Sequence, residues 1–163
     1  MIDESVISLK DLKYGFSLVF LLYPLYNIPM SHDLIKQLVS DILSLDDIMF
    51  SVNSGNGICE VRSERGLPVR INEKWMTIGN EGKSWHIHLN LENVNTGKFV
   101  KETRQGGMNA YSIRFIDSNG NVAMRANFVK MYDDNGNLLS SKSNRYDELF
   151  IKYGKREIIE FTA

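Results

Sequence analysis

Four strand-like segments in the second half of the chain, separated by strong turn signals, constrain the fold more than any other feature. They read SWHIHLNL, GKFVKETR, AYSIRFID and NVAMRANFVKMY, and the turn sequences QGGMN and DSNG separate the last three. Gly, Asn and Asp favour tight turns because they accept left-handed backbone or hydrogen-bond to it. This pattern predicts a series of antiparallel hairpins.

Two helices are expected on either side of these strands. Residues 31–44 carry apolar side chains at helical spacing after Ser31, which is a good N-cap. Residues 140–154 predict a second helix, and Gly154 is suited to end it. Its apolar face is formed by Tyr146, Leu149, Phe150 and Tyr153.

The remaining segments complete an α+β pattern. Residues 47–64 predict two strands joined by a turn at 53–57, and residues 156–163 predict a last strand. Residues 66–83 look irregular apart from a short strand at 69–72. Hairpins followed by a helix predict a single α+β domain with a mostly antiparallel sheet flanked by helices, and 163 residues suit one domain.

The charge balance and the single cysteine exclude several classes of function. The chain has 19 Lys plus Arg and 20 Asp plus Glu, so no global positive field attracts nucleic acid, and nucleic-acid binding is not expected. Cys59 cannot form an internal disulfide, which suits a reducing, cytoplasmic environment. A zinc site of the Cys-x-x-Cys type is also excluded.

The N-terminal part is unusually apolar over residues 16–30. This stretch is shorter than the roughly 20 residues of a membrane span, and Pro24 interrupts it, so no transmembrane segment is expected. It is a packed segment, a signal or anchor, or an extension ahead of the working domain. We divide the chain into an apolar extension, residues 1–30, and a domain over residues 31–163.

Two histidines share one strand in WHIHLNL, residues 85–91. Alternation places His86 and His88 on the face opposite Trp85, Ile87 and Leu89, and therefore toward solvent or a cleft. Two histidines at this spacing reach one metal, but a metal site needs a third ligand. Three interpretations stay open: a divalent metal site, a solvated polar face, or imidazole ligands for a larger molecule.

Arginines extend the polar pattern to two further strands. Arg114 alternates with Ile113 and Phe115, and Arg125 alternates with Met124 and Ala126. The three strands therefore predict one common polar face. Imidazole together with arginine suits a flat, apolar, dicarboxylated ligand such as haem, because Arg holds carboxylates by paired hydrogen bonds. The arginines equally suit surface ion pairs with Glu or Asp.

Several catalytic and metal motifs fail on inspection. An EF-hand with Gly136 at its sixth position would need acidic ligands where the chain has Met131 and Lys142. The sequence contains no phosphate loop, dinucleotide fingerprint or Gly-x-Ser-x-Gly elbow. No catalytic residue is therefore predicted.

The stretch from Trp85 to Phe128 resembles the cytosolic haem-iron utilisation proteins, the HemS/ChuX/HutX group and its smaller relatives. The matching features are the histidine-bearing strand, KFVKE, the Asp-x-x-Gly strand end in SIRFIDSNG, VAMRANF, and the Tyr-Gly helix end in LFIKYG. Their order and spacing carry the resemblance, which extends over about residues 32–160.

The resemblance implies a large antiparallel sheet, a homodimer in many members, and binding or intracellular transfer of haem. It implies His86 or His88 as the axial iron ligand, and Arg114 and Arg125 as contacts of the haem propionates. We expect a non-enzymatic haem-binding or haem-trafficking protein. The alternatives are a small haem-degrading or metal-assisted enzyme and a non-catalytic interaction module.

Overall fold

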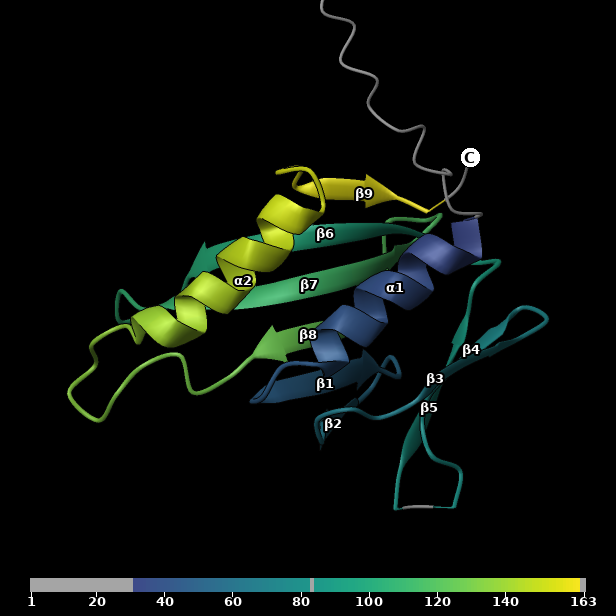
Figure 1. Cartoon of the computed structure of the whole chain (residues 1–163), viewed down its shortest axis with the longest axis horizontal. Coiled ribbons are helices and arrows are strands. Elements are labelled where there is room, and N and C mark those ends of the chain that lie inside the picture. The colour runs from purple at the N-terminus through teal and green to yellow at the C-terminus, as the bar shows by residue number, and fades with distance from the viewer. Residues whose placement is uncertain (1–30, 83, 162–163) are drawn as a thin grey trace, which may run out of the picture.

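Two antiparallel sheets and two helices make up the part of the chain that the structure describes, residues 31–82 and 84–161 of a computed structural model. The larger sheet has six strands in the order β2-β1-β8-β7-β6-β9, and the smaller has three in the order β3-β4-β5. Figure 1 shows both helices on one face of the larger sheet. The predicted α+β class with antiparallel sheets is confirmed.

The elements have the following bounds. The helices are α1 (Ser31–Leu43) and α2 (Ser140–Lys152). The large sheet contains β1 (Ile48–Asn53), β2 (Ile58–Arg62), β6 (Val94–Thr103), β7 (Asn109–Asp117), β8 (Val122–Phe128) and β9 (Ile158–Glu160). The small sheet contains β3 (Val69–Asn72), β4 (Trp75–Gly79) and β5 (His86–Asn90).

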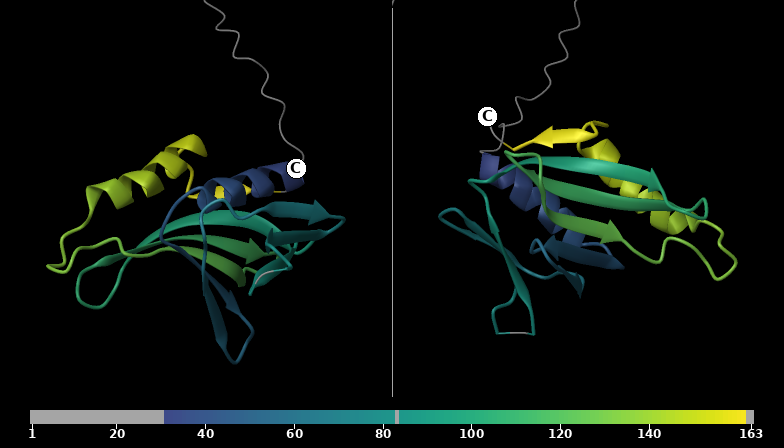
Figure 2. Two further views of the ribbon diagram at one scale, coloured as in Figure 1. Left: turned by 60° about the horizontal axis from the view of Figure 1, so that its bottom comes forward. Right: turned by 180° about the vertical axis from the view of Figure 1, so that it is seen from behind.

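The core lies between the large sheet and the helices. Phe50, Ile113, Phe115 and Ala126 come from the adjacent strands β1, β7 and β8 and are fully buried. Burial of each large apolar side chain contributes on the order of 1.5–3 kcal/mol. Neither of the two described helices covers the opposite face of the sheet, as Figure 2 shows, and this face carries the alternate, more polar residues of the same strands.

A glycine allows one helix and the last strand segment to approach the sheet. A Cβ at Gly97 on β6 would lie 2.8 Å from Cζ of Phe161 and 3.4 Å from Cδ2 of Leu38 on α1. Phe161 is itself 3% exposed and stacks on Phe115 with a centroid distance of 6.2 Å. The missing side chain at Gly97 is therefore part of the packing between α1, β6 and the C-terminal segment.

The small sheet lies beside α1 and contributes one apolar face to the same core (Figure 1). Met76 and Ile78 on β4 are fully buried, Leu89 on β5 is 6% exposed, and β3 contacts α1. The expectation that residues 66–83 are irregular beyond 69–72 was wrong, because β4 lies there. The other predicted elements are present, and Gly154 follows α2 with a φ of 82°.

Two further expectations concern the chain outside this core. The apolar extension, residues 1–30, lies outside the described residues, so its division from the domain stays a prediction. Within residues 31–82 and 84–161, none of the helices is long and apolar enough to cross a membrane.

Candidate functional site

The residues predicted for the site lie on two different sheets. His86 and His88 are on β5 of the small sheet, whereas Arg114 is on β7 and Arg125 on β8 of the large sheet. The common face that the sequence pattern predicted for all four does not exist. β5 pairs with β4, and the chain passes to the other sheet in the turn between Asn90 and β6.

The polar face of the small sheet brings residues of all three strands into one row. Arg70 on β3 lies opposite Thr77 on β4, and Thr77 lies opposite His88 on β5. The neighbouring pairs place Trp75 opposite Asn90 and Gly79 opposite His86. The opposite face of the sheet is packed into the core, so this face points outward.

The two imidazoles lie close together on this face. Their ring centroids are 4.8 Å apart and their planes are inclined by 70°. Oγ1 of Thr77 lies 3.0 Å from Nδ1 of His88. This hydrogen bond fixes the orientation of the His88 ring and leaves its Nε2 without a partner among the described residues. Both histidines are exposed, so the prediction that they lie off the core is confirmed.

A cleft of about 700 Å³, which we call the histidine cleft, opens on this polar face. Its volume falls in the usual range of small-molecule sites. Trp75 is 42% exposed, and its ring provides an apolar wall of the cleft. The lining residues are Arg70, Ile71, Asn72, Glu73, Trp75, Thr77, Glu81 and His88.

The histidine cleft gives no support to a dedicated divalent metal site. Among the described residues, no group of three or more His, Cys, Asp and Glu side chains is placed to hold a metal ion. Two imidazoles alone do not complete the three or four ligands that zinc requires.

The two predicted arginines lie opposite each other on the uncovered face of the large sheet. Arg114 and Arg125 are cross-strand partners of β7 and β8. Nη2 of Arg114 donates to Oε2 of Glu102 at 2.7 Å, and Nε of Arg114 is buried without a partner. Arg114 thus matches the alternative of a surface ion pair, whereas Arg125 has no side-chain partner within the described part of the chain.

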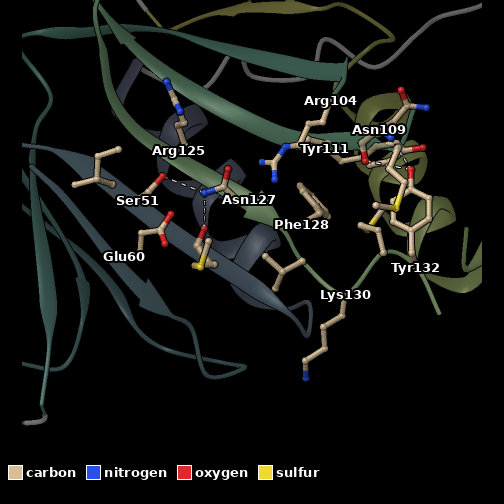
Figure 3. Close-up of a pocket in the computed structure, with 16 residues that line it drawn as sticks. Ser51, Glu60, Arg104, Asn109, Tyr111, Arg125, Asn127, Phe128, Lys130 and Tyr132 are labelled. Carbon is tan, nitrogen blue, oxygen red and sulfur yellow. Dashed lines mark hydrogen bonds between the residues drawn. The ribbon is translucent and has the colours of Figure 1, made fainter. Parts of the chain in front are cut away.

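A second hollow, the arginine cavity, lies on the large sheet beside Arg125 and has a volume of about 460 Å³ (Figure 3). Arg104, just after β6, reaches toward Asn127 and Phe128, whereas the Arg125 side chain extends away from Asn127 at the other end of the group of residues drawn. Nδ2 of Asn127 donates to Oγ of Ser51 at 3.0 Å. No histidine is among the residues that line this cavity.

Sequence reasoning missed Arg70, Trp75 and Thr77 of the histidine cleft. A signal for them exists in VRINEKWMTIG, where Val69 and Ile71 alternate with polar residues. Met76 and Ile78 repeat that alternation on β4. The hairpin between β3 and β4 was not predicted because its connecting residues, Glu73 and Lys74, are not usual turn residues. Glu73 nevertheless adopts a φ of 51°, as a tight turn requires.

The comparisons with known proteins define the class of this fold. A family model described as "-like:-like" matches residues 36–154. The match covers well over half of the chain, so the chain belongs to the family that this model describes. No curated protein sequence matches significantly.

Solved structures then specify the fold as that of the haem-utilisation proteins. The haem-binding protein ChuX matches with a TM-score of 0.61 and 17% identity, over 74% of this chain and 72% of that chain. ChuS, a haem oxygenase of Escherichia coli, matches with a TM-score of 0.54 and 15% identity, over 73% of this chain and 35% of that chain. The haem-binding protein PhuS of Pseudomonas aeruginosa matches with a TM-score of 0.53 and 13% identity, over 72% and 32%.

At these identities the likeness shows the fold alone. The chain spans only about a third of the ChuS and PhuS chains. The expected structural similarity to the haem-utilisation proteins is confirmed.

Proposed function

We propose that this protein binds haem in the histidine cleft and carries it inside the cell, without catalysing its breakdown. The observation that carries the proposal is the row Arg70–Thr77–His88 beside the exposed ring of Trp75. It joins the three chemical features that a haem requires of its site. These are a nitrogen donor, a flat apolar wall and a cation for a carboxylate.

The donor chemistry of the cleft fits haem. Neutral imidazole is a usual axial ligand of haem iron, and ligating histidines commonly have their second ring nitrogen hydrogen-bonded. His88 has that arrangement, because Thr77 holds Nδ1 while Nε2 has no partner among the residues that the structure describes. We therefore assign the iron ligand to His88 and a neighbouring contact to His86, whose ring centroid is 4.8 Å away.

The charges around the cleft suggest how a haem would be oriented. Arg70 is exposed and has no partner among the described residues. Glu73 and Glu81 also line the cleft and disfavour an approach of the propionates from their sides. Arg70 is thus the cation toward which a propionate would turn. In this proposal it replaces Arg114 and Arg125, which are on the other sheet.

A haemin titration of the full chain tests the proposal. Binding by imidazole nitrogen shifts the Soret band of haemin, and the shift should saturate at one haemin per chain. The absence of a saturable shift at micromolar haemin would remove this function and leave the fold unaffected. Size-exclusion measurement with and without haemin would test the homodimer that the family resemblance implies.

A further inference from the structure

We propose that the arginine cavity is a second binding site, for a fatty-acid-like carboxylate with an apolar tail. The cavity lies on the large sheet, whereas the histidine cleft lies on the small one. The inference is independent of haem binding, because it rests on other residues and another ligand chemistry.

The charged residues of the cavity favour an anion. The side chains of Arg104 and Arg125 have no ion pair or hydrogen bond within the described part of the chain. Lys130 adds a third positive charge, although it pairs with Asp47 at 2.9 Å. Glu60 is the only carboxylate among the lining residues. Guanidinium groups without partners are suited to hold a carboxylate through paired, charge-assisted hydrogen bonds.

Polar groups near the arginines add hydrogen-bonding capacity. Oγ of Ser51 accepts from Nδ2 of Asn127, which leaves the Ser51 hydroxyl proton free to donate. Nδ2 of Asn127 also donates to the Met49 carbonyl at 3.2 Å, so the amide orientation is fixed. Ser51 is 8% exposed. The cavity therefore presents a nearly buried hydroxyl donor on the floor of the large sheet.

The apolar lining favours a flexible tail over a compact anion. Ile58 and Met108 are 68% and 48% exposed, and they border the same cavity as Met49 and Phe128. Large apolar side chains that are exposed at a cavity indicate a surface that binds apolar ligands. Methionine side chains adapt to ligands of variable shape. A chain of several CH₂ groups with one carboxylate matches both the cations and the methionines.

Octanoate is the probe that tests this site, and 1-octanol is the neutral control with the same tail. We expect octanoate to shift the amide resonances of Ser51, Asn109 and Asn127 of the isotope-labelled full chain in a saturable way. Octanol should bind at least tenfold more weakly. Arg104→Gln and Arg125→Gln should each weaken octanoate binding at least tenfold, whereas Arg70→Ala should leave it unchanged.

Three results would overturn the proposal. The first is no saturable shift at millimolar octanoate, and the second is equal binding of octanol. The third is a combined result, in which Arg104→Gln or Arg125→Gln loses haemin binding and haemin competes with octanoate. The arginine cavity would then be the haem site. Failure of haem binding in the histidine cleft would leave octanoate binding intact, so the two proposals fail separately.

Discussion

Thr77 and His88 lie directly opposite each other on β4 and β5, and Oγ1 of Thr77 lies 3.0 Å from Nδ1 of His88. The contact orients an exposed imidazole, which also lies edge-on to the ring of His86. Because an imidazole ligand coordinates iron best when its other nitrogen is hydrogen-bonded, this pair links the small sheet to the proposed function.

Removing the Thr77 hydroxyl should weaken haem binding without unfolding the protein. Thr77→Val keeps the side-chain shape and deletes the partner of His88 Nδ1. Loss of such an outer-shell partner typically costs about 10–100-fold in metal affinity, and we expect a loss in this range in a haemin titration. Circular dichroism controls for the fold. Wild-type affinity in a folded Thr77→Val protein would refute the orienting role of Thr77.

The position of the propionate contact can be tested with two arginine variants. Arg70→Ala should weaken haemin binding by about tenfold, because a charge-assisted hydrogen bond is lost. Arg125→Ala is the matched control on the large sheet and should bind haemin as the wild type does. The reverse ranking would return the propionate role to the arginine predicted from the sequence and place haem on the large sheet.

Gly97→Ala should destabilise the fold. The added Cβ would meet Cζ of Phe161 at 2.8 Å, and overpacking of this kind typically costs about 1–3 kcal/mol. Denaturant unfolding measures the loss. Gly57→Ala is the control, since its Cβ would meet only Oγ of Ser54 at an ordinary 3.6 Å. Equal stability of the two variants would mean that Phe161 does not pack as described.

Asp47 should stabilise the fold in a pH-dependent way. Hydrogen bonds from Lys142 at 2.5 Å and from Lys130 lower the pKa of its carboxyl below the ordinary value of 3.8. A lowered pKa in the folded state gives stability that is present above pH 3.8 and is lost as the pH falls through the folded-state pKa.

Asp47→Asn removes the charge and keeps a residue that tolerates the φ of 59° at this position. The variant should unfold more easily than the wild type at pH 7, and the difference should shrink below pH 3.8. Urea unfolding at several pH values measures this difference. A difference that stays constant down to pH 2 would mean that the ion pairs do not cause it.

Local sequence patterns predicted well which segments of the large sheet are strands. They predicted poorly to which of the two sheets a strand belongs. Strict alternation around Ile113 and Phe115 identified the core-facing side of β7, because successive side chains of a strand point to opposite faces of the sheet. The alternation around Arg114 and Arg125 likewise identified the uncovered face correctly. These features depend only on neighbouring residues in the sequence.

The pairing of β5 could not be read in the same way. Asn90 ends β5 and Val94 begins β6, and sequential strands usually lie next to each other. Here the chain changes sheets within that short turn, so the two strands that follow each other in the sequence are not neighbours in a sheet. The residues that flank His88 in space, Arg70 and Thr77, therefore became visible only in the structure.

The central claim is that the His88 imidazole binds haem iron. Absorption and electron paramagnetic resonance spectra of the ferric haem complex of the full chain test it most directly, in the wild type, His88→Ala and His86→Ala. We expect the signature of nitrogen ligation in the wild type and in His86→Ala, and its loss in His88→Ala. A nitrogen-ligated spectrum that persists in a folded His88→Ala protein would contradict the claim.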